Sequence, residues 1–392
     1  MSHPYEFIDT PEQYQPLIDR LARAETVVLD TEADSLHHYH QKICLVQVGL
    51  QGRAWLVDPL SKLDPAPLLE VLAHKELLMH GADYDLRMLY RGWGFRPARV
   101  FDTMLAAQLL GWEQVGLAAL MERICGVEIS KALQRADWSR RPLGENLLRY
   151  AADDVHYLPR VVAHMTSELE AAGRLEWHCE TCERLIENAC APKQEENGEA
   201  WRIKGGRHLR GQAAAVLREL WHWRDRAARH ADRPAFHVAG TDFLLLWAKW
   251  VGEHPGDRPE DGPAHPRWLR GRRREAFEQT LRQTLALPES KWPGPPPARH
   301  RSRLKREEEG RLERLIIARD AEARRLAIDP GVLAPRESLR QLIRCPPACA
   351  DELDERSPLM RWQTGCLAAA IIDEMGLGGG VSEDQPGAKN DS

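Results

Sequence analysis

Four acidic side chains and a tyrosine in the first half of the chain could together do chemistry that none of them does alone. They are Asp30 and Glu32 in VVLDTEADS, Asp85 in HGADYDL, and Tyr150 with Asp154 in YAADDVHYL. Oxygen donors of this kind are the ligands that Mg²⁺ and Mn²⁺ prefer. If the carboxylates converged without a cation, they would repel one another and raise one another's pKa. Convergence would therefore imply bound cations.

Local spacing supports part of this grouping. Asp30 and Glu32 end a short apolar run, and the two-residue period of a strand puts both side chains on one face. Solvated acids at a strand end are the more ordinary explanation for that pair taken alone. Asp85 begins a helical pattern, where its charge suits the helix dipole, although Asp83 would make the better N-cap.

The stretch YAADDVHYL lies in a helical pattern of apolar residues three and four positions apart. Tyr150 and Asp154 therefore point together, and Asp153 is turned by about 100° from Asp154. Asp153 would instead share a side with Tyr157. Helical spacing alone leaves open which tyrosine and aspartate pair faces a site.

Strand and helix patterns alternate in the first part of the chain and predict an α/β fold with a mixed sheet flanked by helices. Strands are predicted at 26–30, 42–50, 53–59, 76–81 and 99–102, and helices at 65–75, 84–94 and 102–111, with helical text from about 116 to 190. In the last of the three short helices, Asp102 is a natural N-cap and Gly111 a stop signal.

Two small all-α regions are predicted to follow. A polar linker at 191–207 precedes a helical sequence pattern from 209 to about 286. A stiff Pro-rich linker at 292–300 precedes a second helical pattern that extends to about 375. The Gly-rich tail 376–392 is expected to be disordered. Trp221, Trp223, Trp247 and Trp250 lie on apolar helix faces and are interpreted as core.

Composition narrows the class of protein. The formal net charge of −5 does not by itself indicate nucleic acid. The N-terminus lacks the features of a secretory signal, and no apolar run reaches about 18 residues, so a membrane protein is not expected. Eight scattered cysteines indicate a reduced, cytoplasmic protein. Cys179, Cys182 and Cys190 with His178 resemble half a zinc site, and free thiols on helix faces are the expected alternative.

The motifs VVLDTEADS, CLVQVG, HGADYDLRML, FDTMLAAQLLG, KALQRADWSRRPL and YAADDVHYLP follow one another between about residues 25 and 165. Their order resembles the DEDD superfamily of 3′→5′ exonucleases, in its tyrosine subgroup, and within it the ribonuclease D family. The resemblance implies a ribonuclease H-like fold over residues 1–190. Within this frame Tyr150 and Asp154 form the last motif, and Asp153 takes a position that the motif leaves free.

The same resemblance implies roles for the residues. Asp30, Glu32 and Asp154 would hold one Mg²⁺ or Mn²⁺ ion with the attacking water, and Asp85 a second ion. Tyr150 would orient the water, since an unperturbed pKa near about 10 makes it a poor base. Ser35 and Leu36 would touch the terminal nucleotide. Ala33 and Gly81 differ from residues common in relatives, which puts substrate preference in doubt and leaves the carboxylates intact.

The helical regions resemble HRDC domains, at 208–290 and in a divergent second copy at 301–375. Arg270, Arg272 and Arg273 in the basic run 266–274 are expected to contact RNA, with a solvated helix face as the alternative.

The expected protein is a monomeric 3′→5′ exoribonuclease that trims tRNA precursors or other structured RNA, without a small-molecule cofactor. A DNA exonuclease and an inactive nucleic-acid-binding scaffold are the competing hypotheses. His37, His38 and His40 are expected to be loop histidines facing solvent or a substrate channel rather than a metal cluster.

Overall fold

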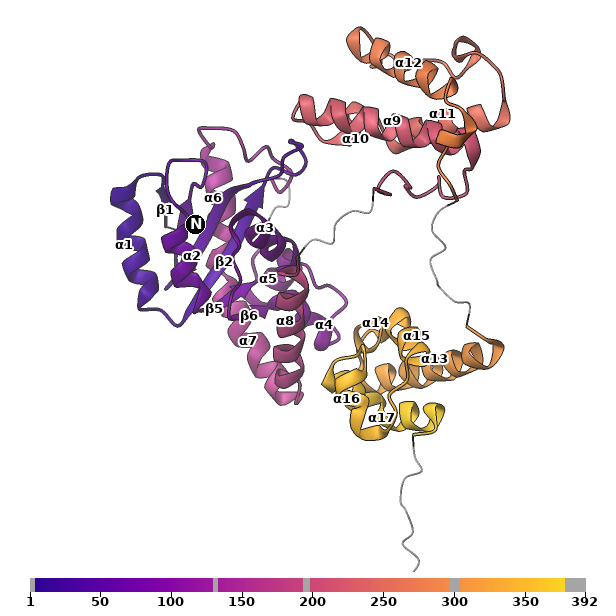
Figure 1. Ribbon diagram of the computed structural model, residues 1–392. Coiled ribbons are helices and arrows are strands. Elements are labelled where there is room, and N and C mark those ends of the chain that lie inside the picture. Colours follow the sequence, from indigo (N-terminus) through magenta and orange to yellow (C-terminus); the bar gives the residue numbers. More distant parts are fainter. Residues whose placement is uncertain (1–3, 130–132, 193–197, 296–303, 378–392) are drawn as a thin grey trace, which may run out of the picture.

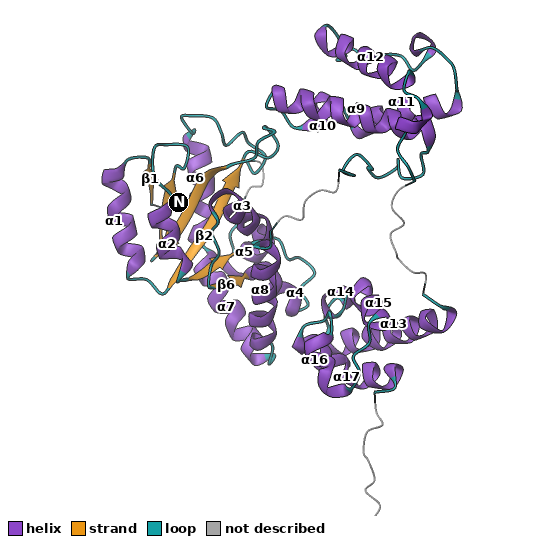
Figure 2. Cartoon of the chain, viewed as in Figure 1, coloured by secondary structure: helices purple, strands orange, loops and turns teal. Residues whose placement is uncertain are grey.

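The computed structural model describes residues 4–129, 133–192, 198–295 and 304–377 (Figure 1). An α/β region comes first along the chain, and two all-helical regions follow it (Figure 2). This order confirms the predicted fold class, while the exact domain limits and the HRDC assignment stay predictions. The predicted disordered tail lies outside the described residues from 378 onward.

A six-stranded mixed sheet forms the centre of the first region, in the order β1-β4-β3-β2-β5-β6. The strands are β1 (Tyr5–Ile8), β2 (Thr26–Ala33), β3 (Ile43–Leu50), β4 (Arg53–Val57), β5 (Glu76–Met79) and β6 (Arg99–Asp102). Strand β2 pairs antiparallel with β3 and parallel with β5, so the strand direction changes at the middle of the sheet. Ligand sites often lie at the carboxyl ends of strands beside such a change.

Helices cover both faces of this sheet. They are α1 (Pro11–Ala22), α2 (Ala66–Ala73), α3 (Asp83–Trp93), α4 (Thr103–Leu109), α5 (Leu117–Cys125), α6 (Glu145–His156), α7 (Leu158–Ala171) and α8 (Leu175–Ala189). Val27 and Leu29 of β2 pack into the core formed with α1, α2 and α3, and Val28 packs into the core with α4, α5 and α7. Asp30 and Glu32 continue the alternation of Val28 and therefore point to the second face.

Helix α6 approaches this second face closely because Gly49 has no side chain. Gly49 lies opposite Val28 in the β2–β3 pairing. A Cβ atom at Gly49 would lie 2.9 Å from the Cβ of Val28 and 3.1 Å from the carbonyl oxygen of Val155 on α6. The close approach brings Tyr150 and Asp154 of α6 next to the end of β2.

Two parts of this region differ from the sequence prediction. The N-terminal segment forms β1 and α1, which no pattern assigned, and β1 pairs parallel with β4 at the sheet edge. The prediction of continuous helix from about 116 to 190 is wrong at 126–129 and 133–144, which are not helical. Gly126 ends α5 in a left-handed conformation with φ 70°. Helices α6 and α7 meet at Tyr157, just before Pro159, which could not donate a hydrogen bond within a longer helix.

The first all-helical region has its own core. Its elements are α9 (Gly211–His230), α10 (Ala235–Val238), α11 (Thr241–Glu253), η1 (Pro259–Asp261), α12 (Arg272–Leu285) and η2 (Glu289–Lys291). Trp223, Trp247 and Phe277 are buried together, and Trp221 and Trp250 pack against them. This confirms the interpretation of the four tryptophans as core.

The second all-helical region shares an apolar core with the α/β region. Its elements are α13 (Arg306–Leu326), α14 (Pro330–Leu333), α15 (Arg336–Arg344), η3 (Ala350–Glu352), α16 (Leu353–Arg356) and α17 (Arg361–Met375). The ring of Trp177 on α8 stacks on Trp362 of α17, with 4.8 Å between centroids. Glu180 of α8 accepts the backbone N–H of Arg361 at 2.6 Å, which satisfies a donor at the start of α17.

The same interface contains a close backbone contact. Arg174 donates to the carbonyl oxygens of Leu109 and Leu326, each at 2.6 Å. A Cβ atom at Gly111 would lie 1.8 Å from the carbonyl oxygen of Ala327. Only glycine therefore allows the end of α13 to lie where it does.

Asp102 is a buried carboxylate that joins two elements near the end of the sheet. It accepts the N–H groups of Met104 at 2.8 Å and Leu105 at 3.3 Å, which confirms the predicted N-cap of α4. It also accepts the N–H groups of Gly81 at 3.0 Å and Ala82 at 2.8 Å. One side chain thus fixes both α4 and the turn that leads from β5 into α3.

Replacing Asp102 with alanine should lower the free energy of unfolding by about 2–4 kcal/mol, because buried N–H groups lose their acceptor. Asp64 is a matched control: it accepts a single N–H, that of Ala66, at 3.0 Å, and is exposed. Asp64→Ala should cost less than about 1 kcal/mol. Chemical denaturation of both variants checks this, and equal losses would contradict the bridging role of Asp102.

Candidate active site

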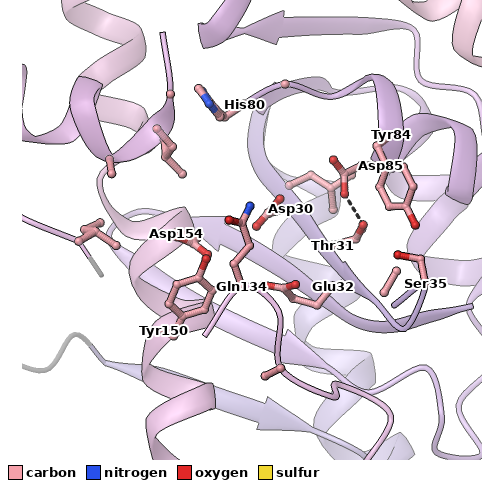
Figure 3. Close-up of a pocket in the computed structure, with 18 of the residues that line it drawn as sticks. Asp30, Thr31, Glu32, Ser35, His80, Tyr84, Asp85, Gln134, Tyr150 and Asp154 are labelled. Atoms are coloured by element: carbon pink, nitrogen blue, oxygen red, sulfur yellow. Dashed lines mark hydrogen bonds between the residues drawn. The ribbon is translucent and has the colours of Figure 1, made fainter. Parts of the chain in front are cut away.

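A pocket of about 440 Å³ lies at the carboxyl end of β2. Its lining includes Asp30, Glu32, Asp85, Tyr150 and Asp154, together with Ser35 and Leu36. In Figure 3, Asp154 and Tyr150 lie on one side, Asp85 and Thr31 on the other, and Asp30 and Glu32 between them. The structure thus brings together the predicted catalytic residues, which are up to 124 positions apart in the chain.

Asp30 and Glu32 share the pocket with little to neutralise their charge. Burial, and then the charge of Asp154, raise the pKa of Asp30 to about 8. Burial, and then the charge of Asp30 and the carboxylates beyond it, raise the pKa of Glu32 to about 10. Both groups would therefore retain protons near neutral pH in the absence of a cation.

Asp85 enters the pocket from the opposite side of the sheet. It lies in the first turn of α3, and the hydroxyl of Thr31 on β2 donates to its carboxylate. Burial, and then the charge of Asp30, raise the pKa of Asp85 to about 8. The expectation that Asp83 caps α3 is wrong: Asp83 is the first helical residue and pairs with Arg87 at 2.8 Å. Asp102 already holds the preceding turn.

Tyr150 and Asp154 face the pocket together, as residues four apart on a helix should. The hydroxyl of Tyr150 donates to the Asp154 carboxylate. Burial raises the pKa of Asp154 to about 7, and burial and nearby carboxylates raise that of Tyr150 well above its ordinary range. Asp153 and Tyr157 line a neighbouring hollow instead. Packing on the sheet thus separates two pairs that helical spacing left equivalent.

The segment 133–141 supports this tyrosine. Trp138 is fully buried, and its ring lies 6.1 Å from that of Tyr150. The guanidinium of Arg141 pairs with Asp58 at 2.6 Å and donates to the carbonyl of Cys44 at 2.7 Å. Trp138 is therefore part of the core, and Arg141 is bound by protein groups rather than free to contact a substrate.

The chemistry of the pocket fits divalent metal ions. Among the residues that the structure describes, no group of three His, Cys, Asp or Glu side chains is arranged to hold an ion as it stands. The four carboxylates offer only oxygen donors, and burial is the first cause of their raised pKa values, an effect that a bound cation would oppose. Exonucleases of this kind use divalent metals, and Asp30, Glu32, Asp85 and Asp154 are the residues that would hold them.

Sequence reasoning missed several residues of the pocket. Tyr84, Gln134 and His80 line it, and none had been singled out. Tyr84 is 45% exposed and Leu36 is 44% exposed, so two apolar surfaces border the carboxylates. Two of them could have been found from their position next to the motifs: Tyr84 directly precedes Asp85, and Gln134 lies within KALQRADW.

Other candidate groups lie elsewhere. Arg270 and Arg272 are exposed and Arg273 is half-buried, and they lie before and within the first turn of α12, not in the pocket. On α8, Cys179 is exposed and Cys182 contacts His178, with 3.4 Å between sulfur and ring nitrogen.

No helix in the described part of the chain is long and apolar enough to cross a membrane.

Known proteins with similar sequences and structures extend this description. Residues 5–170 match a family described as 3′-5′ exonuclease. The ribonuclease D of Pseudomonas paraeruginosa is 32% identical over 322 residues, 81% of this chain and 84% of that protein. A protein from Bifidobacterium adolescentis superposes with a TM-score of 0.78 at 24% identity, covering 96% of this chain and 99% of that one. RNase D of Escherichia coli superposes with a TM-score of 0.68 at 24% identity, covering 95% and 98%.

The mixed sheet, with carboxylates gathered where its strand direction changes, is that of the 3′→5′ exonucleases. Within this class the chain belongs to the ribonuclease D family. The enzyme is accordingly a 3′→5′ exoribonuclease, and nucleic acid is its substrate.

Neighbouring aspartates provide a test of the site. Asp154→Asn should lower kcat by at least about 100-fold, because it removes a charged oxygen donor from the pocket. Asp153→Asn should change kcat by less than about threefold, since its side chain lines the neighbouring hollow. Steady-state kinetics on a short RNA, with circular dichroism to verify folding, measures both. Equal loss in two folded variants would contradict this placement.

The raised pKa values predict how stability depends on pH without metal. Asp30, Asp85 and Asp154 titrate near about 4 when unfolded but at about 8, 8 and 7 in the fold. The folded state therefore binds more protons in this window, and its stability should fall as pH rises from 5 to 8. Melting temperatures in EDTA should show this fall, reduced in Asp30→Asn. Mg²⁺ should raise the wild-type melting temperature most at pH 8. A metal-induced shift that is larger at pH 5 would contradict the proposed exchange of protons for cations.

Proposed function

We propose that the enzyme removes nucleotides one at a time from the 3′ ends of structured RNAs, such as tRNA precursors, and releases nucleoside 5′-monophosphates. The observation that carries the proposal is the pocket itself: acidic groups face Tyr150, and exposed apolar surfaces border them. A pocket of about 440 Å³ has room for one terminal nucleotide. Escherichia coli RNase D is described as an exoribonuclease involved in structured RNA processing, which supports this substrate class.

In the proposed reaction, Asp30, Glu32 and Asp154 would hold one divalent ion and Asp85 would take part in holding a second. Two Mg²⁺ or Mn²⁺ ions bound there would lower the pKa of the attacking water and offset charge on the departing 3′-oxygen. Tyr150 remains protonated at neutral pH because its pKa is raised. Its hydroxyl therefore acts as a hydrogen-bond donor that orients the water, rather than as a base.

Contacts with the RNA are proposed at two places. Ser35 and Leu36 in the pocket lining would touch the terminal nucleotide, where the exposed side of Leu36 can pack on a base. Arg270, Arg272 and Arg273 would contact phosphates farther from the 3′ end. Such contacts are independent of sequence and weaken with salt.

The proposal also covers the location, the oligomeric state and the cofactor requirement of the enzyme. We place it in the cytoplasm as a monomer that needs no small-molecule cofactor. The free cysteines of the described residues fit a reducing compartment. HRDC domains at 208–290 and 301–375 would help to hold structured RNA.

A comparison of 5′-labelled RNA and DNA of one sequence tests the function. Each carries a hairpin with a single-stranded 3′ extension and is incubated with Mg²⁺, Mn²⁺ or EDTA. A descending ladder on RNA that needs metal and stops at the hairpin base is expected, with 5′-monophosphates as products. Asp30→Asn is the inactive control. A ladder on DNA alone would favour a DNA exonuclease, and no metal-dependent product would overturn the nuclease proposal.

A further inference from the structure

The loop that follows β2, residues 34–42, joins the pocket to the first all-helical region. At its start, Ser35 and Leu36 line the pocket. At its tip, His38, Tyr39 and His40 contact the turn that follows α9. One short loop therefore touches the terminal-nucleotide side of the pocket and a separate helical region.

Asp232 is the centre of this contact. Its Oδ2 lies 2.8 Å from Nδ1 of His38, and its Oδ1 accepts the backbone N–H groups of Tyr39 at 3.1 Å and His40 at 3.2 Å. The hydrogen bonds with His38 and His40 hold the pKa of Asp232 at about 2. The carboxylate is therefore ionised at neutral pH, and all three contacts are with a charged acceptor.

The backbone of Asp232 has an unusual conformation. Its φ is 44°, in the left-handed region where glycine or asparagine commonly follows a helix. Aspartate at this position points its carboxylate at the tip of the loop. Strained residues of this kind persist where surrounding contacts hold them, and they occur often at functional sites.

Helix α9 adds a second set of contacts to the same loop. The hydroxyl of Tyr39 donates to Asp225 at 2.7 Å. The guanidinium of Arg229 lies 5.5 Å from the centre of the Tyr39 ring and donates to its hydroxyl at 3.2 Å. The loop is thus held by two turns of α9 as well as by Asp232.

The loop in turn holds the segment 133–141 on the other side of the pocket. Nε2 of His38 lies 2.9 Å from the Ser139 hydroxyl, and Nε2 of His37 lies 3.1 Å from the carbonyl oxygen of Arg135. This segment contributes Gln134 to the pocket lining. His38 therefore contacts the helical region through one ring nitrogen and the pocket segment through the other.

We propose that Asp232, acting through His38, positions the pocket that receives the 3′-terminal nucleotide. The first helical region would then set how tightly that nucleotide binds, in addition to any RNA contact of its own. The inference rests on the proposed exonuclease function. Asp232 and His38 are positioning residues here, since neither lies among the reacting groups.

A substrate confined to the pocket separates positioning from RNA contact. The p-nitrophenyl ester of a nucleoside 5′-monophosphate carries one nucleotide and no further phosphate for a helical region to hold. In the full-length protein, Asp232→Asn keeps a residue suited to the left-handed turn, and His38→Gln removes the ring. Each should raise KM for the ester by about tenfold with a smaller change in kcat. The double variant should be no worse than His38→Gln alone, because both single variants remove the contact between His38 and Asp232. Asp257→Asn, an exposed site in the same helical region, should leave KM unchanged.

Hydrogen exchange gives a second measurement that does not depend on catalysis. Asp232→Asn should speed amide exchange in residues 34–42 and 133–141, with melting temperature little changed. Unchanged KM for the ester together with weaker binding of long RNA would overturn the proposal and leave the helical region as an RNA contact only. Unchanged exchange in both segments would also overturn it. Wild-type protein that fails to hydrolyse the ester and RNA alike would count against the exonuclease function, while exchange would still decide the positioning role.

Discussion

Like charge held in a desolvated pocket is the constraint on which the rest of this structure depends. Burial raises the pKa of Asp30, Glu32, Asp85 and Asp154 alike, and each of the first three also feels a neighbouring carboxylate of the set. Side chains that repel do not gather by their own attraction. The surrounding fold must hold them, and retained protons relieve the repulsion until cations replace those protons.

The fold meets this constraint with rigid elements on both faces of β2. Asp30 and Glu32 project to the face where Gly49 lets α6 come close with Asp154. Asp85 arrives from the other face, fixed by a hydrogen bond from Thr31. The turn before Asp85 is in turn held by Asp102, a buried acid that accepts four N–H groups. Backbone donors satisfy that carboxylate, so Asp102 is structural although it lies close in sequence to the pocket residues.

Local periodicity accounts for what the sequence could predict. A period of two placed Asp30 and Glu32 on one face, and a period of four paired Tyr150 with Asp154. Periodicity could not choose against Asp153 with Tyr157, because the choice depends on which side of α6 packs on the sheet. It also missed β1, whose pairing with β4 joins residues about 49 apart, and Gln134, which no charge or spacing marks. The contact of His38 with Asp232 spans 194 positions and has no local pattern at all.

The two helical regions contact the α/β region through different kinds of interaction. The second shares a continuous apolar core with it, including the stacked pair Trp177 and Trp362. Separating that interface would expose buried apolar surface, which is strongly unfavourable. The first is attached through the Tyr39 ring, which packs against its core, and through polar contacts of Asp232 and Tyr39, which are partly exposed and can exchange for water at a small net free energy. Of the two interfaces, the one between the first region and the pocket loop is therefore the weaker, because it buries less apolar surface and its polar contacts compete with water.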